Sequence, residues 1–354
     1  MVDRGLNEMA NEPLRVVALR DADSISLELS ASGGAFPLLA RPILEDGGVV
    51  FGSEMLQGGE VRHVMIESVA DLSRLQGSKY VKSATGGTFD KCADLLREGR
   101  TILYSGTPCQ IFALRSYLRL YGFEESDLDR LYTVDLICHG VTNPALFKLY
   151  IAWLENIKNA ISGSLFYRFR SKRQGWGLYY HFRYVSKRSG KIVEQNGQWD
   201  EDPYYAAYLS GKFYLKSCYS CKFANRRRVG DFTIGDYWGI EREHPGFEYE
   251  KGASVVLINT PKSMAFFSKR CEAACILEES SFELAAKNNR NLNAPAVRSA
   301  NDAALAERVE EAVRAGDAEL VFGKLLKRPS DLKRAMRNMI PHSVRIAAKR
   351  MLYR

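Results

Sequence analysis

The chain has 354 residues, 46% of them hydrophobic, which is enough for one large domain or two smaller domains with buried cores. It has no apolar run of about 18 residues, and residues 1–13 lack the apolar segment of a signal peptide. We therefore expect a cytosolic protein with reduced thiols, in which seven cysteines serve metal binding, redox chemistry or core packing rather than disulfides.

The net charge of +8 is concentrated near the C-terminus. Residues 321–354 contain ten Lys or Arg and one Asp, whereas the rest of the chain contains 40 basic and 41 acidic residues. The body is therefore close to neutral, and the basic composition characterises the tail alone.

The first half of the chain alternates strand patterns with helix patterns. Apolar runs bounded by turn residues predict strands at 14–21, 46–52, 61–66, 101–105 and 131–137. Helical spacing of apolar residues predicts helices at 35–44, 69–76, 89–99, 110–121 and 143–158. This alternation indicates an α/β fold, with a mixed, largely parallel sheet and flanking helices. In such sheets the chemistry lies at the carboxyl ends of the strands, and Cys109 and Cys138 each follow one.

The sequence changes character after residue 160. Segments 165–170 and 178–184 alternate aromatic and basic residues, as the strands of a β-hairpin do. A helix at 203–215 leads into a cysteine loop, a strand follows at 254–259, and 261–275 and 282–315 are expected to be mostly helical. We expect three regions: an α/β region (1–160), a region of hairpin, cysteine loop and helices (161–320), and a basic helical tail (321–354).

Four cysteines in three short motifs form the strongest chemical pattern. They are Cys109, Cys138, Cys218 and Cys221, the last two in a Cys-x2-Cys pair. Four thiolates suit either a tetrahedral zinc ion or a cubane iron–sulfur cluster. The alternative is that the first two are buried core residues and the pair binds zinc with other partners, or binds nothing. The remaining cysteines lie in helical patterns and are expected to be plain thiols: Cys92, Cys271 and Cys275.

Several turns could approach an anionic or planar cofactor. Ser32, Gly33 and Gly34 precede a predicted helix, whose backbone N–H groups attract anions. Lys79 lies in an extended segment, and Gly106 and Thr107 form a rigid turn after a buried strand. His139, beside Cys138, could donate a proton to a substrate or serve as a structural hydrogen-bonding residue.

The tail combines apolar and basic faces. Apolar residues recur at helical spacing on both sides of Pro341, and Lys and Arg occupy the other faces. This pattern suits an anionic membrane surface. The alternatives for the tail are a helix docked on the body or a nucleic-acid-binding segment. The predicted hairpin of aromatic and basic residues could bind single-stranded nucleic acid, but its pattern equally matches a half-exposed sheet.

Seven motifs in order resemble the beta subunit of the coenzyme F-420 hydrogenase/dehydrogenase family. They are Ser-Gly-Gly (32–34), Gly-Ser-Lys-Tyr-Val (77–81), Gly-Thr-Pro-Cys-Gln (106–110), Asp-Leu-Ile-Cys-His-Gly (135–140), Arg-Ser-Lys…Gly-Trp-Gly (170–177), Cys-x2-Cys (218–221) and Gly-Asp…Gly-Asp-Tyr-Trp-Gly (230–239). The resemblance covers roughly residues 25–260. Related members include proteins found with bacterial polysaccharide-synthesis genes.

The resemblance implies an FAD beside a 4Fe–4S cluster. It implies that the cluster ligands are Cys109, Cys138, Cys218 and Cys221. It implies that the flavin-side residues are Ser32, Gly33, Gly34, Lys79, Tyr80, Gly106 and Thr107. The activity implied is electron transfer between a one-electron carrier and an organic hydride donor or acceptor, with His139 as the proton donor.

The sequence departs from many relatives because residues 1–91 contain no cysteine, and so no N-terminal ferredoxin module. We therefore expect a separate electron carrier such as a ferredoxin, or direct reduction by the substrate. The basic tail favours a cytoplasmic protein peripheral to the membrane, with a role in polysaccharide biosynthesis. The alternative function is a non-redox or zinc-stabilised scaffold at the membrane, and we do not expect nucleic acid as the partner.

Overall fold

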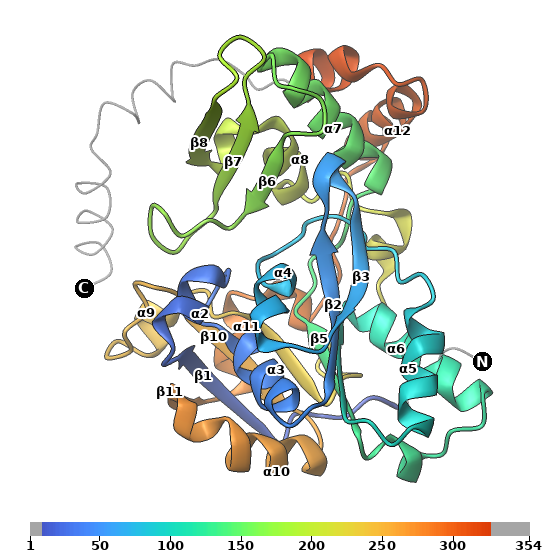
Figure 1. The fold of residues 1–354 in the computed structure, drawn as a ribbon, viewed down its shortest axis with the longest axis vertical. Coiled ribbons are helices and arrows are strands. Elements are labelled where there is room, and N and C mark those ends of the chain that lie inside the picture. The colour runs from blue at the N-terminus through green and yellow to red at the C-terminus, as the bar shows by residue number, and fades with distance from the viewer. Residues whose placement is uncertain (1–8, 327–354) are drawn as a thin grey trace.

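Two β-sheets organise the structure, a computed structural model that describes residues 9–326. The larger sheet has eight strands in the order β11-β1-β10-β9-β5-β4-β2-β3, and it forms the lower part of the molecule in Figure 1. Its strands are β1 (Arg15–Asp21), β2 (Val49–Met55), β3 (Val61–Ile66), β4 (Ile102–Gly106), β5 (Leu131–Leu136), β9 (Phe232–Asp236), β10 (Ser254–Ile258) and β11 (Cys275–Ser280).

The mixed α/β fold predicted from the sequence is confirmed. Strands β2, β4, β5 and β9 pair in parallel, whereas β3 at one edge and β10, β1 and β11 at the other side pair antiparallel. Parallel pairing is thus confined to the centre of the sheet. The prediction that 261–275 is mostly helical is confirmed by a helix that ends at Arg270 and a single helical turn at Glu272–Ala274, after which the chain enters the edge strand β11.

Helices cover both faces of the large sheet. One face packs against α3 (Ala35–Glu45), α4 (Leu72–Leu75) and α10 (Pro261–Arg270). The other packs against α5 (Thr88–Arg97), α6 (Pro108–Leu120), α9 (Ile240–Glu243) and α11 (Phe282–Lys287). Along β1, Val17 and Leu19 enter the first core while Val16 and Ala18 enter the second, as the two-residue period of a strand requires.

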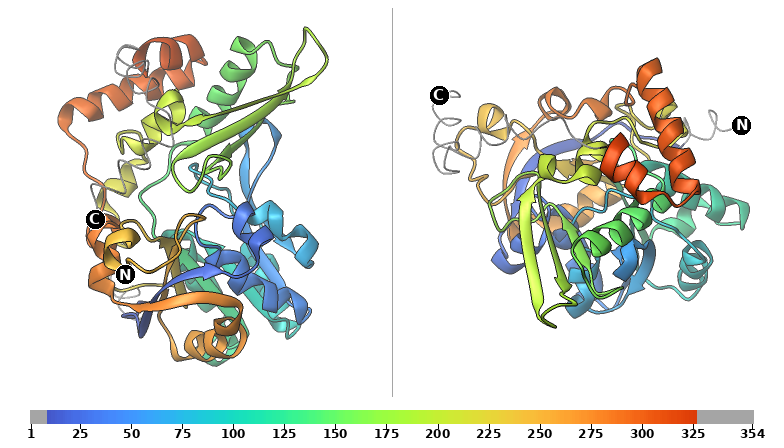
Figure 2. Two further views of the ribbon diagram at one scale, coloured as in Figure 1. Left: turned by 90° about the vertical axis from the view of Figure 1, so that its left-hand side faces the viewer. Right: turned by 90° about the horizontal axis from the view of Figure 1, so that it is seen from above.

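The smaller sheet lies above the larger one (Figures 1 and 2). Its strands are β6 (Phe166–Phe169), β7 (Tyr179–Val185) and β8 (Ile192–Gln198), in antiparallel order β6-β7-β8. The predicted hairpin is therefore extended by a third strand. One face of this sheet packs, through an aromatic core, against α7 (Pro144–Ile157), α8 (Pro203–Leu209) and α12 (Ala300–Arg314).

The first residues assigned to the tail belong to this aromatic core. Val321 and Phe322, in the π-helical segment η8 (Glu319–Leu325), are buried against α7 and α12. The rest of the predicted amphipathic tail, 327–354, lies outside the described residues. Within residues 9–326, no helix has both the length and the apolar character needed to cross a membrane.

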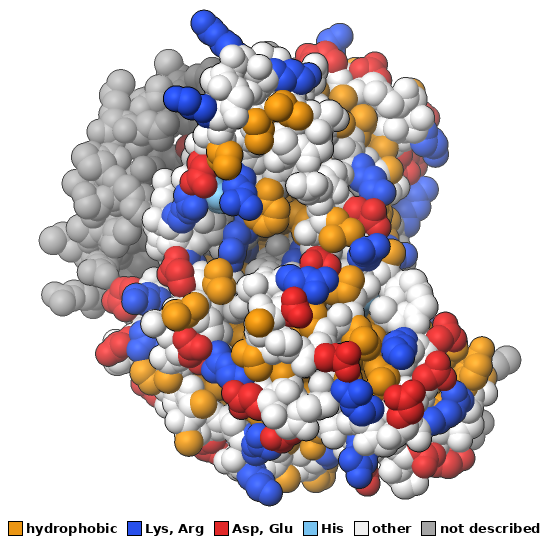
Figure 3. Space-filling model, viewed as in Figure 1, with side chains coloured by type: hydrophobic (Ala, Val, Ile, Leu, Met, Phe, Trp, Pro, Cys, Tyr) orange, Lys and Arg blue, Asp and Glu red, His pale blue; other side chains and the backbone are white. Residues whose placement is uncertain are grey.

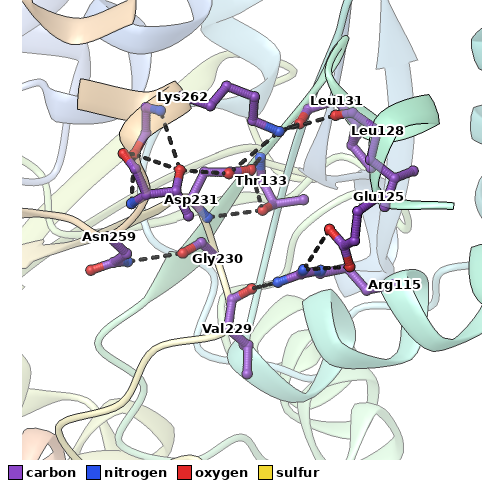
Figure 4. A network of polar contacts seen from close by, with 12 residues as sticks. Arg115, Glu125, Leu128, Leu131, Thr133, Val229, Gly230, Asp231, Asn259 and Lys262 are labelled. Atoms are coloured by element: carbon purple, nitrogen blue, oxygen red, sulfur yellow. Dashed lines mark hydrogen bonds and ion pairs between the residues drawn. The ribbon is translucent and has the colours of Figure 1, made fainter. Parts of the chain in front are cut away.

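A polar network fixes the start of β9 against β5 (Figure 4). The carboxylate of Asp231 accepts hydrogen bonds from the backbone N–H and the hydroxyl of Thr133, both at 2.8 Å. Lys262 donates to the carbonyl oxygens of Leu131 and Leu128 and lies 3.4 Å from Asp231. Asn259 donates to the carbonyl of Gly230 at 2.9 Å. These contacts join β5, β9 and β10 to one another where β9 begins.

A fully buried ion pair continues this network toward the carboxyl end of β5. Arg228 donates to Asp135 at 2.7 Å, and the two side chains are 2% and 0% exposed. The other carboxylate oxygen of Asp135 accepts from the N–H groups of Val229 and Gly230. Arg228 also donates to the carbonyl of Phe223, which closely follows the cysteine loop. The pair therefore ties that loop to the strand that ends before Cys138.

We expect Arg228→Met to lower the free energy of unfolding by about 3–5 kcal/mol, because it leaves the Asp135 carboxylate buried without its partner. Urea unfolding followed by circular dichroism measures this change. The matched control is Arg226→Met, since Arg226 is 45% exposed and pairs with Glu12 and Glu283 at the surface. That variant should lose less than about 1 kcal/mol, and equal losses in both variants would contradict the role given to the buried pair.

Candidate functional site

A cavity of about 360 Å3 opens between the two sheets, at the carboxyl ends of the central parallel strands. Its walls come from the segment before α3, the segment 75–83, the loops after β4 and β5, the end of β9, and Arg170 above them. The prediction that the ends of β4 and β5 share one edge is confirmed by their register, in which Gly106 lies opposite Asp135. Figure 3 shows the hollow between the upper and lower parts of the molecule.

The Ser32–Gly34 turn delivers the N-terminus of α3 to this cavity. Gly34 has a φ of +84°, a conformation that glycine adopts without strain, and it lines the cavity together with Ser32. The Ser32 hydroxyl is already engaged, donating to the carbonyl of Ala253 at 2.6 Å. Gly33 does not line the cavity. A Cβ there would lie 2.3 Å from the Leu19 carbonyl oxygen, so this glycine allows close packing on β1 and β10.

Lys79 and Tyr80 form another wall. The Lys79 ammonium donates to the carbonyls of Leu75 and Gln76 at 2.7 and 2.9 Å, and burial lowers its pKa to about 7. The ring of Tyr80 stacks on Tyr208 with their centroids 4.2 Å apart. Lys79 can therefore present either a neutral amine or a cation to a ligand at neutral pH.

A hydrogen-bonded chain supports the turn after β4. Gln110 accepts from the Thr107 N–H at 3.0 Å and donates to the Ser83 carbonyl and hydroxyl at 3.1 Å. The Ser83 hydroxyl in turn lies 3.1 Å from His63 Nδ1, and His63 Nε2 lies 2.9 Å from the Ser105 carbonyl oxygen. Since a carbonyl can only accept, the proton of the neutral imidazole sits on Nε2. Burial lowers the pKa of His63 to about 4.

Arg170 and Asp236 close the cavity from above. The backbone of Arg170 is in the left-handed region, with a φ of 56°. Its guanidinium makes a bidentate pair with the carboxylate of Asp236, at 2.5 and 2.6 Å. It also donates to the carbonyl of Ala31, and it lies 4.9 Å from the centre of the Trp238 ring. Trp176 stacks on Trp238 and donates to Asp236 at 3.1 Å. The buried fork thus joins the upper sheet to the lower one.

His139 lies in the wall of the same cavity, directly after Cys138. Burial lowers the pKa of its imidazole, while the nearby Asp236 carboxylate opposes that shift. At neutral pH the ring is therefore largely neutral, and it can both accept and donate a proton.

The four cysteines predicted as a ligand set come together in space. Cys109 lies in the first turn of α6, because that helix begins at Pro108 rather than at residue 110. Cys138 follows β5, and Cys218 and Cys221 lie at the loop containing the short helix η5 (Lys216–Ser220). The thiol of Cys138 is close enough to the other three for electrostatic interaction with each of them. All seven cysteines are free thiols.

Three of these thiols, those of Cys138, Cys218 and Cys221, have raised pKa values and so resist deprotonation. Burial raises the pKa of Cys138 to about 12, and burial together with the neighbouring thiols also raises the pKa of Cys218 and Cys221. Metal ligation would then release protons. Within residues 9–326, no three His, Cys, Asp or Glu side chains are arranged to hold a single metal ion.

Sequence reasoning located much of the cavity wall but missed important parts of it. The predicted residues that line it are Ser32, Gly34, Lys79, Tyr80, Gly106, Thr107 and His139, together with Cys138. The residues missed include His63, Ser83, Gln110, Arg170 and Asp236. Arg170 and Asp236 lie within the sequence motifs 170–177 and 230–239, and that position was the signal that could have identified them as site residues. His63 lies on a strand that carries no such motif.

An α/β domain with a deep cavity at its parallel strand ends, and with four thiols beside that cavity, has the features of a redox protein. The family model for the C terminus of the coenzyme F420 hydrogenase/dehydrogenase beta subunit matches residues 99–283, more than half of the chain. The protein therefore belongs to the coenzyme F420 hydrogenase/dehydrogenase beta-subunit family, and it carries the oxidoreductase domain of that family.

A solved structure supports the fold. The chain is similar to one in the xenon-derivatised F420-reducing [NiFe] hydrogenase complex from Methanosarcina barkeri, with a TM-score of 0.50 and 17% identity. The match covers 85% of this chain and 92% of that chain. At this identity the likeness establishes a shared fold. No curated protein matches the sequence.

We expect His63→Gln to flatten the dependence of stability on acid pH. In the folded state the pKa of His63 is about 4, against an ordinary value of 6.5, so the unfolded chain takes up the proton first as the pH falls. Stability is thus lost between about pH 6.5 and 4, and this histidine accounts for about 2–3 kcal/mol of that loss.

Urea unfolding of both proteins at pH 7 and pH 4 tests this. Other titrating groups are common to both proteins and cancel in the comparison. An equal loss of stability in the two proteins would contradict the assignment of a neutral, buried His63.

Proposed function

We propose that the protein is an FAD-dependent iron–sulfur oxidoreductase that moves electrons between a one-electron carrier and an organic hydride donor or acceptor. One observation carries the proposal: Cys138 lies in the wall of the main cavity and also belongs to the group of four thiols. A planar redox cofactor in the cavity and an inorganic cluster on the thiols would therefore be immediate neighbours.

The donor set fits a 4Fe–4S cluster. Four thiols come from three separate segments and lie near one another, and within residues 9–326 no three such side chains are arranged to hold a single metal ion. A cubane of four irons is larger than one ion and takes four thiolate ligands. We assign Cys109, Cys138, Cys218 and Cys221 as those ligands. The hydroxyl of Thr107, which donates to Gln110 Oε1 at 3.0 Å, also lies 3.2 Å from Cys109 Sγ and so borders that ligand.

The main cavity fits the flavin. The α3 N-terminus at Gly34 would face an anionic part of it, and Lys79, Tyr80, Gly106 and Thr107 would contact the remainder. Gly33 would not contact the flavin; it supports this turn by packing closely against β1. When bound, FAD would supply two-electron hydride exchange and the cluster would supply single-electron transfer.

The residues of the chain would handle the proton and the exclusion of water. His139 is largely neutral and lines the cavity beside Cys138, so it can hold the proton that accompanies substrate turnover. The Arg170–Asp236 pair closes the cavity roof and holds the upper sheet in place. The buried pair, with the stacked rings of Trp176 and Trp238 beside it, would limit the access of solvent to the reacting atoms.

We propose a separate one-electron carrier such as a ferredoxin as the partner, on the ground that residues 1–91 hold no cysteine. The basic residues of 321–354 support binding to an anionic membrane surface at the cytoplasmic side. A bacterial member of this kind would act in polysaccharide biosynthesis on a membrane-delivered substrate.

We expect Cys218→Ser to lose most of its iron and sulfide while the fold survives, because a hydroxyl does not replace a thiolate on iron. Anaerobic purification followed by iron, sulfide, zinc and flavin analysis measures the effect. Cys275→Ser is the matched control, since Cys275 lies in β11 and its thiol donates only to the carbonyl of Glu272. Full iron content in the Cys218→Ser variant would remove Cys218 from the ligand set. If the wild-type protein holds zinc and no flavin, the alternative function as a scaffold is favoured.

We expect Gly106→Val to lower flavin content but not iron content. A Cβ at residue 106 would already lie 3.3 Å from Gln110 and 3.5 Å from His63 Nε2, so valine intrudes on the cavity wall. Overpacking costs about 1–3 kcal/mol, and where that cost falls on the flavin-bound state it weakens flavin binding about 5- to 150-fold. Gly246→Val is the control, because nothing lies within 4 Å of a Cβ there. Unchanged flavin in Gly106→Val would place the flavin elsewhere.

A further inference from the structure

A second cavity, of about 320 Å3, lies between α2 (Ser24–Leu29) and the three-stranded sheet. It has none of the residues assigned above to the flavin or the cluster. Its side chains include four Lys or Arg and one histidine against two glutamates. On the face shown in Figure 3, Lys and Arg side chains gather along the lower edge of that sheet.

The two-residue period of the strands builds this basic surface. On β7, Tyr180 and Phe182 enter the aromatic core, so His181 and Arg183 point to the opposite face. On β6, Arg168 lies opposite His181 in the register, on that same face. The basic residues that alternate with aromatics in the sequence are therefore collected on one side of the sheet.

Two of the basic side chains, the buried Lys172 and the half-buried Arg168, donate only to neutral oxygens. Arg168 donates to the carbonyl of Leu29 at 2.5 Å, and Lys172 donates to the carbonyls of Leu27 and Ser32 at 2.5 and 2.6 Å. Among the described residues neither forms an ion pair, although the exposed Glu28 attracts both from a distance. A buried cation ordinarily has an anionic partner. Burial lowers the pKa of Lys172 to about 7, so an anion bound in the cavity beside it would favour its protonated form.

Further donors face the same space. The Nε2 of His181 is buried without a hydrogen-bond partner and lies 3.6 Å from Glu194 Oε2. Arg183 is exposed and lies over the ring of Phe166 at 5.5 Å, which leaves its guanidinium edge available. Arg173 pairs with Glu194 at 2.5 Å at the rim. Planar guanidinium groups and an ammonium around one cavity are the donors that bind phosphate oxygens.

The second cavity adjoins the main one. Lys172 donates to the carbonyl of Ser32, and Ser32 lines the main cavity. Arg170, two residues before Lys172, closes the roof of the main cavity. A molecule with a reactive end and an anionic end could therefore reach both sites around the segment 27–32.

We propose that the second cavity binds the phosphate or diphosphate group of an organic phosphate ester, the substrate whose other end reacts in the main cavity. The assignment of this molecule as the substrate rests on the proposed oxidoreductase function, but the anion site itself does not. Arg168, Lys172 and Arg183 hold the phosphate oxygens, and His181 Nε2 supplies a further hydrogen bond.

Calorimetric titration with inorganic pyrophosphate at low ionic strength tests the site in the anaerobically purified protein, whose iron and flavin contents are measured on the same sample. Lys172→Met removes a buried donor and Arg183→Gln removes an exposed one, so the second variant remains informative if the first fails to fold. The matched control is Arg188→Gln, in the exposed turn between β7 and β8 and outside the cavity.

We expect one pyrophosphate per chain, bound at least about 10-fold more weakly by Lys172→Met and Arg183→Gln and unchanged in Arg188→Gln, since each lost bond is to a charged group. Absent binding, or equal affinity in all four proteins, would overturn the site. Tighter binding of citrate than of pyrophosphate would overturn the phosphate class. If loading the protein with flavin abolishes pyrophosphate binding, the cavity belongs to the diphosphate of the flavin itself, and the substrate site is overturned. If the protein holds neither iron nor flavin but still binds pyrophosphate, only the proposed oxidoreductase function is overturned.

Discussion

The buried pair of Arg228 and Asp135 is the interaction on which the rest of the site depends. Both side chains are removed from solvent, so each charge is tolerable only while the other is present. The carboxylate also holds the N–H groups of Val229 and Gly230, and the guanidinium holds the carbonyl of Phe223. One pair thus fixes the end of β5, the entry to β9 and the segment after the cysteine loop in a single arrangement.

This constraint explains how distant cysteines can form one group. Cys138 is carried by β5, Cys109 by the helix that follows the adjacent strand, and Cys218 and Cys221 by a loop whose far end Arg228 anchors. The cysteine loop is not part of a sheet or a long helix, so contacts with neighbouring elements have to hold it in position. The Asp231 network beneath them keeps β5 and β9 in register and completes the support.

A second joint connects the two sheets. Arg170 adopts a left-handed conformation, which costs free energy in a residue with a side chain, and its fork on Asp236 offsets that cost. Two residues later Lys172 reaches back to the carbonyls of Leu27 and Ser32. The segment 170–172 therefore borders both cavities, Arg170 lining the main one and Lys172 the second.

The sequence by itself determined the mixed α/β class, the main helices and strands, and the residue types beside the cavity, because strand ends, small-residue turns and cysteine motifs are local patterns. It could not determine that β1 lies between β10 and β11, that residues 275–280 form an edge strand, or that Val321 and Phe322 complete the upper core. Only the tertiary structure decided the roles of His63, Arg228 and the Arg170–Asp236 pair, and it decided which helices cover the aromatic face of the small sheet. The physical reason is that burial and charge compensation join residues far apart in the chain, and no local spacing encodes such partners.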